Sequence, residues 1–89
     1  MTIADGSQII DQLKPMLREV SNGRARVDGL TRDALIIEDV GLASLDLLEM
    51  RFELENHWHL QIADEDLIRL KTVGDVVDLI LERQQPQND

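Results

Sequence analysis

The side chains best placed for chemistry in this chain are one serine and two histidines. Ser44 stands where a glycine-containing loop turns into a predicted helix. A serine there can cap the helix, act as a hydrolytic nucleophile or accept a modifying group. A nucleophile needs a base within hydrogen-bond reach, and His57 and His59 are the only histidines. On a helix that rises ~1.5 Å per residue, His57 lies roughly 20 Å from Ser44. A serine–histidine pair within this chain is therefore not expected.

The two histidines do not form a metal site either. His57 and His59 flank Trp58, and side chains two residues apart point the same way only in a strand. No cysteine or further histidine completes a ligand set. We interpret this segment as the polar end of a helix around a core tryptophan, and we expect no metal and no catalytic residue in the chain.

Acceptance of a modifying group fits Ser44 best, although the capping role stays open. A hydroxyl at a helix N-terminus after a glycine-containing loop is accessible to a modifying enzyme. A phosphodiester formed there would be stabilised by free backbone N–H groups and by the positive end of the helix dipole. The chain is therefore predicted to be a substrate of other enzymes and not an enzyme.

Composition limits the class of partner. The chain has 89 residues, and 18 acidic against 9 basic residues give a formal net charge of −9. Such a surface repels nucleic-acid phosphates and favours partners with basic patches. No stretch approaches the ~20 apolar residues of a membrane helix, and the start, Met1–Gly6, does not have the pattern of a secretory signal. We expect a cytoplasmic monomer that binds neither nucleic acid nor membrane.

Apolar spacing predicts two long helices in the first two thirds of the chain. The first runs from about Ser7, a plausible cap, to Val20, and Pro15 inside it predicts a kink or a late start. A long connection over residues 21–43 has no sustained periodicity, but its apolar side chains must lie on the core. The second helix runs from Ser44 to His57 or Trp58.

Two shorter helical segments follow. Asp64–Leu70 is predicted to form one or two turns, with Asp64 as cap. The last helix begins at Thr72, with Asp75 three residues later in a capping arrangement. Its buried stripe is Val73, Val76, Val77 and Ile80, with Leu79 and Leu81 at the margins. We therefore expect one domain over residues 7–83, with a disordered start over 1–6 and a disordered tail over 84–89.

The second predicted helix is apolar on two opposite faces. One face is the natural core stripe and carries Leu47, Met50, Leu54 and Trp58. The opposite face carries Leu45, Leu48 and Phe52. Carboxylates border this second face: Asp46, Glu49 and Glu53 along one edge, and Glu55 near the other. An apolar strip with an acidic border is typical of a recognition surface. The alternative is that the preceding loop covers Leu45 and Leu48.

In this order and spacing, five pieces of the chain resemble the acyl carrier protein family and its peptidyl and aminoacyl carrier relatives. The pieces are Glu38–Leu42, Ser44–Asp46, Phe52–Glu55 with Trp58, Ile62–Asp66 and Thr72–Asp75. The resemblance covers about Ser7 to Arg83. It implies an all-α, four-helix domain with a long loop between helices one and two and a short third helix.

The resemblance also implies a function. Ser44 would receive 4'-phosphopantetheine from coenzyme A through a phosphopantetheinyl transferase, and the thiol of that arm would carry an acyl or aminoacyl group as a thioester. A loading ligase or synthase with basic patches would bind the second helix. The docking residues would be Leu45, Asp46, Leu48, Glu49, Phe52 and Glu53. The alternative is an unmodified helical interaction module with a carrier-like fold.

One departure from the family bears on the pathway. Fatty-acid-type carriers of bacteria usually have aspartate directly before the serine, and this chain has Ala43. The missing carboxylate favours a specialised pathway over housekeeping fatty-acid synthesis. The sequence does not distinguish a fatty acyl, polyketide or amino-acid cargo, and it assigns no role to Arg51.

Overall fold

The computed structural model describes residues 6–84, and this part of the chain is helical with no strand. The elements are α1 (Gly6–Val20), a π-helical turn η1 (Ile36–Val40), α2 (Ser44–Trp58), α3 (Asp64–Leu67) and α4 (Val73–Arg83). The all-α class, the long first connection and the short third helix are confirmed. The predicted disordered ends fall largely outside the described residues, except that Gly6 begins α1 and Gln84 is the C-cap of α4.

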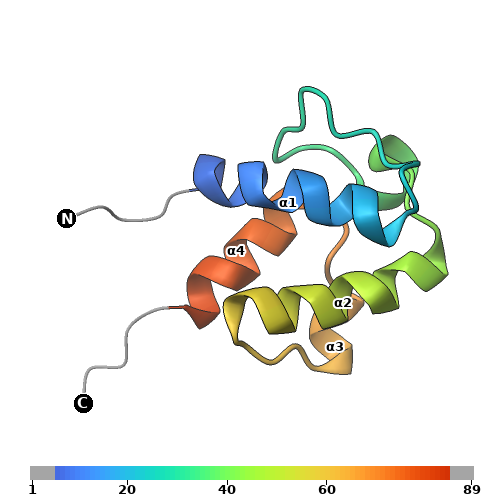
Figure 1. Cartoon of the computed structure of the whole chain (residues 1–89). Helices are drawn as coiled ribbons and strands as arrows, with labels where there is room; N and C mark the ends of the chain where they lie inside the picture. Colours follow the sequence, from blue (N-terminus) through green and yellow to red (C-terminus); the bar gives the residue numbers. More distant parts are fainter. Residues whose placement is uncertain (1–5, 85–89) are drawn as a thin grey trace, which may run out of the picture.

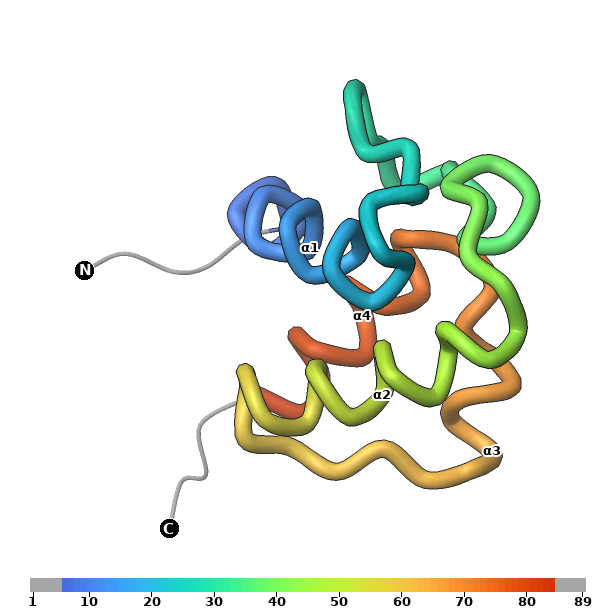
Figure 2. The backbone as a smooth tube through the Cα atoms, turned by 45° about the vertical axis from the view of Figure 1, so that its right-hand side comes forward, coloured from blue at the N-terminus to red at the C-terminus, as the bar shows by residue number. Residues whose placement is uncertain are grey.

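The helices pack around one core. In Figure 1, α1 and α2 run antiparallel beside each other, α4 runs from behind α1 down past the end of α2, and α3 lies below α2; Figure 2 shows the same elements from another side. The contacts between helices are mainly those of α1 with α4 and of α1 with α2. Most of the deeply buried large side chains come from α1, η1, α2 and α4, and they include Ile9, Leu13, Ile36, Met50, Leu54 and Ile80.

Helix α1 is continuous through Pro15, so the predicted late start is wrong. Pro15 is exposed. The opposite side of the helix buries Ile9, Leu13, Met16 and Leu17. Burial of that apolar face stabilises the helix by more than a proline costs, because each buried leucine or isoleucine contributes about 1.5–3 kcal/mol.

The connection between α1 and α2 is held to the core and to the segment before α4. Ile36 N–H donates to the Lys71 carbonyl at 2.9 Å, and Val73 N–H donates to the Ala34 carbonyl at 2.9 Å. The chain then forms η1, which the sequence did not predict. Gly41 ends this turn at φ 95°, a conformation that glycine adopts without the steric cost that a Cβ brings. Leu42, two residues before the start of α2, is buried, so the core positions the segment that leads into α2.

Three helices begin with the same device, an aspartate at the third helical position that accepts a hydrogen bond from the N-cap backbone. Asp46, Asp66 and Asp75 accept from the N–H groups of Ala43, Ala63 and Thr72 at 2.8, 3.0 and 3.0 Å. In α4 the box is complete, because the Thr72 hydroxyl also accepts from Asp75 N–H at 3.0 Å. The predicted capping role of Thr72 and Asp75 is confirmed.

One predicted cap is wrong, and a capping role that the sequence left open is not taken. Ala63, and not Asp64, is the N-cap of α3. Ala43, and not Ser44, is the N-cap of α2, so Ser44 is the first residue inside the helix. The physical reason is the same in both cases: the aspartate three residues after the alanine satisfies the exposed backbone N–H, and a capping side chain is not required.

Candidate functional site

Ser44 has a hydroxyl that the fold does not use. Its side chain is exposed, and its oxygen has no hydrogen-bond partner among residues 6–84. The cap position beside it is closed by Asp46, whose Oδ2 accepts from Ala43 N–H at 2.8 Å. In Figure 1 the start of α2 lies at the end of the bundle away from the start of α1 and the end of α4. The hydroxyl is therefore presented to solvent at a helix N-terminus.

Asp46 contributes more to the fold than the sequence indicated. Besides its bond to Ala43, its Oδ2 lies 3.1 Å from Nη2 of Arg24 in the long connection. Its side chain is 14% exposed. A carboxylate with these two partners pins the connection to the first turn of α2. Asp46 therefore orients the segment around Ser44, whatever partner contacts it makes.

The other serines are placed differently. Ser21 is completely buried, donates to the Arg18 carbonyl at 3.2 Å and accepts from Ala25 N–H at 2.8 Å. Ser7 is exposed, but it lies in the first turn of α1, at the other end of the bundle from Ser44 (Figure 1). Only Ser44 combines exposure with a position between a long connection and an apolar surface.

That apolar surface is the second face of α2. Leu45, Leu48 and Phe52 are 77%, 56% and 59% exposed. Glu49 beside them is exposed and Glu53 is half-buried. The preceding connection therefore does not cover Leu45 and Leu48. We call Leu45, Asp46, Leu48, Glu49, Phe52 and Glu53 the docking strip, after the role that the resemblance implies for them.

The core stripe of α2 is confirmed at its centre. Met50 and Leu54 are fully buried, while Leu47 and Trp58 are partly buried against the core. Trp58 lies edge-on to the His57 ring at a centroid distance of 4.3 Å. His57 Nε2 lies 3.2 Å from the Gln12 amide oxygen of α1. The described residues contain no cluster of side chains suited to a metal ion.

Arg51, which had no role from the sequence, joins α2 to α3. Its Nη1 lies 2.7 Å from Asp64 Oδ1, and its Nε lies 3.8 Å from Glu55 Oε2. The same Glu55 oxygen accepts from Ile62 N–H at 2.8 Å in the segment before α3. The i,i+4 spacing of Arg51 and Glu55 was visible in the sequence, but the approach of Asp64 depends on the tertiary fold.

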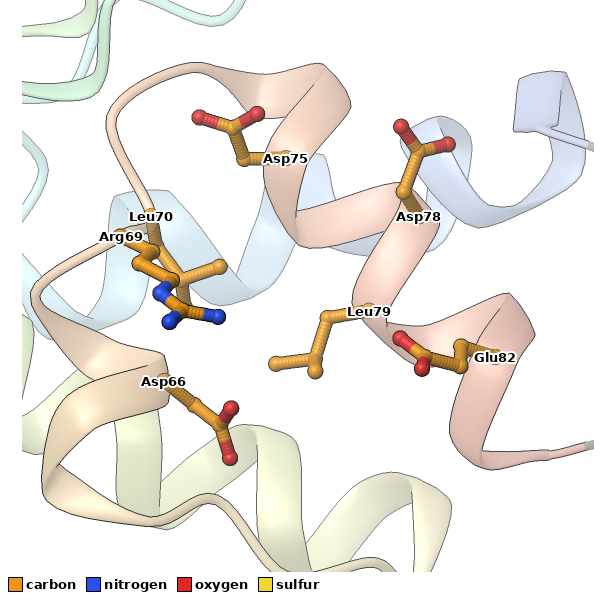
Figure 3. A pocket seen from close by; sticks show the side chains of 7 residues that line it. All are labelled: Asp66, Arg69, Leu70, Asp75, Asp78, Leu79 and Glu82. Atoms are coloured by element: carbon orange, nitrogen blue, oxygen red, sulfur yellow. The ribbon is translucent and has the colours of Figure 1, made fainter.

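A cleft between α3 and α4 gathers carboxylates without forming a site (Figure 3). Its volume is about 180 Å³, and it is lined by Asp66, Arg69, Leu70, Asp75, Asp78, Leu79 and Glu82. Asp66 pairs with Arg83 at 2.9 Å, and this hydrogen bond lowers the pKa of the Asp66 carboxyl. Asp78 pairs with Arg32 at 2.9 Å. These carboxylates hold α3, α4 and the long connection together.

Comparison with known proteins identifies the family. Residues 12–80 match the family described as "Phosphopantetheine attachment site". The chain is also 35% identical over 77 residues to acyl carrier proteins of three Clostridium perfringens strains, SM101, ATCC 13124 and 13, covering 86% of this chain and 99% of each relative. The chain therefore belongs to the acyl carrier protein family.

Membership defines the cofactor and the general role. The cofactor of the family is phosphopantetheine, and its members are carriers and not enzymes. They work with phosphopantetheinyl transferases and with synthases or ligases. In the described part of this chain no helix is both long enough and apolar enough to cross a membrane.

Proposed function

We propose that Ser44 carries 4'-phosphopantetheine and that the chain shuttles an acyl or aminoacyl group between partner enzymes in a specialised biosynthetic pathway. The exposed Ser44 hydroxyl at the first position of α2, which has no hydrogen-bond partner among residues 6–84, supports this most strongly. When bound, the arm supplies a terminal thiol that holds the cargo as a thioester. The protein supplies the attachment point and the surface that partners bind.

The surroundings of Ser44 fit a phosphodiester. The first backbone N–H groups of a helix point outward without intrahelical acceptors, and the helix dipole favours negative charge there. The nearby Asp46 carboxylate is paired with Arg24 at 3.1 Å and with Ala43 N–H at 2.8 Å. Its charge is thus partly compensated next to the attachment point.

The same pairing leaves Ser44 without a base of its own. Asp46 is occupied by its two partners, and His57 lies in the last turn of the same helix against Gln12. During attachment the Ser44 Oγ–H bond breaks as the oxygen bonds to the phosphorus that carries the pantetheine arm of coenzyme A, and the pyrophosphate P–O bond at that phosphorus breaks to release adenosine 3',5'-bisphosphate. The transferase must therefore supply the base that accepts this proton, because the described residues of the chain place none beside the hydroxyl.

The docking strip is proposed to bind the loading and accepting enzymes, with basic patches around an apolar contact. Leu45, Leu48 and Phe52 provide the apolar contact, and Glu49 and Glu53 orient the encounter. We expect charge reversal at Glu49 and Glu53 to slow loading and to make the rate less sensitive to salt, because a screened attraction is lost. Glu82→Lys, an equal reversal at the end of α4, is the matched control; equal rates for all variants at low salt would contradict the assignment.

Ala43 supports the specialised pathway. Fatty-acid-type carriers have a carboxylate directly before the serine. This chain has Ala43 at that position, and Ala43 is also the N-cap residue of α2. Ala43→Asp restores the carboxylate. We expect this variant to be accepted better than wild type by a bacterial fatty-acid ligase, and an unchanged rate would remove this support.

The attachment itself is tested by peptide mapping. The purified chain is incubated with coenzyme A and a promiscuous phosphopantetheinyl transferase, digested and fragmented in a mass spectrometer. We expect the arm on the peptide that contains Ser44. An arm on Ser7 would overturn the site, and no modification by any tested transferase would favour the unmodified interaction module.

A further inference from the structure

A groove beside Ser44 is built by two helices, although the sequence pointed to α2 alone. Its volume is about 590 Å³, and it is lined by Glu19, Val20, Asn22, Leu45, Asp46, Leu48 and Glu49. The first three residues belong to the C-terminal end of α1 and the turn after it. Figures 1 and 2 show why they meet: α1 ends where the antiparallel α2 begins.

The turn that follows α1 leaves the last residues of this helix uncovered, and they line the groove. Asn22 and Gly23 have φ 57° and 84°, and Gly23 N–H donates to the Arg18 carbonyl at 2.7 Å. This left-handed turn leads the chain away from the helix axis. Glu19 stays exposed and Val20 half-buried at the edge.

The groove is lined by apolar and acidic side chains from both helices. Val20 contributes from α1, and Leu45 and Leu48 contribute from α2. Glu19 belongs to α1 and Glu49 to α2; both are exposed, and neither has an ion-pair partner among the described residues. Asp46 in the same groove is already paired with Arg24. The uncompensated charge of the groove is therefore negative.

We propose that this groove receives an apolar side chain of the phosphopantetheinyl transferase, flanked there by basic residues, so that Glu19 of α1 takes part in docking together with Glu49. The proposal rests on the proposed function. Leu45 directly follows Ser44 and lines the groove together with Leu48, so an enzyme that docks at the Ser44 hydroxyl has the groove next to its contact surface. A second copy of the chain fits poorly, because both copies would bring Glu19 and Glu49.

The test uses Glu19→Lys, with Glu49→Lys as the positive comparison and Glu82→Lys as the control. Lysine in the last turn of α1 complements the helix dipole, so Glu19→Lys is not expected to lower stability. At low salt we expect Glu19→Lys to reduce kcat/KM for loading about threefold or more, and the deficit to shrink as salt is raised. Glu82→Lys should match wild type.

A binding measurement separates docking from chemistry. The binding measurement uses a Ser44→Ala background, which cannot be loaded. Titration calorimetry with the same transferase should show a higher Kd for Glu19→Lys and for Leu48→Gln than for Ser44→Ala alone. Suppose that Glu19→Lys has the same kcat/KM and Kd as Glu82→Lys while Glu49→Lys is impaired. The α1 side of the groove is then not used, and this proposal fails while the proposed function stands. A dimer abolished by Leu48→Gln in light scattering would assign the groove to a second copy. If wild type is never loaded, both the proposal and the proposed function fail.

Discussion

Helices α2 and α4 have opposite relations to the core. Of the fifteen residues of α2, only Met50 and Leu54 are buried, whereas the eleven residues of α4 bury Val73, Gly74, Val76, Val77, Leu79 and Ile80. Their starts differ in the same sense. The Thr72 hydroxyl accepts a hydrogen bond from Asp75 N–H at 3.0 Å, while the Ser44 hydroxyl has no partner among residues 6–84.

The two helices thus differ in how many of their groups the fold uses and how many stay available to a partner. In α4 the apolar side chains and the terminal hydroxyl are used by the fold, so few groups are left for a partner. In α2 a narrow stripe around Met50 and Leu54 holds the helix. The side chains of Leu45, Leu48, Glu49 and Phe52 face solvent. At the start of α2 the Asp46 carboxylate accepts the hydrogen bond from Ala43 N–H, so the helix start does not need the serine side chain. The Ser44 hydroxyl therefore stays available for chemistry.

The largest effect is expected where α2 does contribute to the core. Leu54→Ala should lower the free energy of unfolding by about 2–5 kcal/mol, because it empties a fully buried position. Leu48→Ala should change it by only about 0.5 kcal/mol, because the side chain is more than half exposed. Urea denaturation measures both. If Leu48→Ala were the more destabilising variant, the assigned faces of α2 would be reversed.

A smaller, pH-dependent effect is expected at the closed start of α4. Hydrogen bonds from Thr72 and Lys71 N–H lower the pKa of Asp75 below 3.8, so its charged form favours the folded state. Asp75→Ala should cost about 1–2 kcal/mol at neutral pH. Because the folded-state pKa is the lower one, this contribution is present above pH 3.8 and is lost as the pH falls through the folded-state pKa.

The measurement is urea denaturation of wild type and Asp75→Ala at neutral pH and at roughly pH 3. The difference in the free energy of unfolding between wild type and Asp75→Ala should be smaller at the acidic pH. A difference that stayed constant would show that the carboxylate charge does not stabilise the start of α4.

The smallest effect sharpens the comparison of the two hydroxyls. Thr72→Ala removes a capping hydroxyl and should cost about 1 kcal/mol, while Ser44→Ala removes an unpartnered one and should stay within about 0.5 kcal/mol of wild type. Thermal unfolding of both variants checks this. Equal losses would mean that Ser44 has a structural role and that the two starts are alike.

Features that depend on local chain geometry were predictable. The 3.6-residue period placed Met50 and Leu54 inside and Leu45 and Leu48 outside, and both assignments are confirmed. The Thr72–Asp75 box was recognisable because its partners are three residues apart. The same spacing also exists between Ala43 and Asp46, but alanine is not a capping residue type, so the sequence did not indicate Ala43 as the N-cap and left a capping role open for Ser44.

Features that depend on distant segments were not predictable. The ion pair of Arg51 with Asp64, the pair of Arg24 with Asp46 and the π-helical turn held by Lys71 all join parts of the chain far apart in sequence. The groove wall on α1 was missed for the same reason. Glu19 has no local pattern that assigns it to the surroundings of Ser44, and only the antiparallel packing of α1 on α2 brings it there.

The availability of the Ser44 hydroxyl is tested most directly by intact-protein mass spectrometry. Wild type, Ser44→Ala and Ser7→Ala are each incubated with coenzyme A and a phosphopantetheinyl transferase. Wild type and Ser7→Ala should gain the mass of one phosphopantetheine arm, and folded Ser44→Ala should gain none. A full mass gain in Ser44→Ala would contradict the account, because the arm would then be attached to a residue other than the unpartnered hydroxyl at the start of α2.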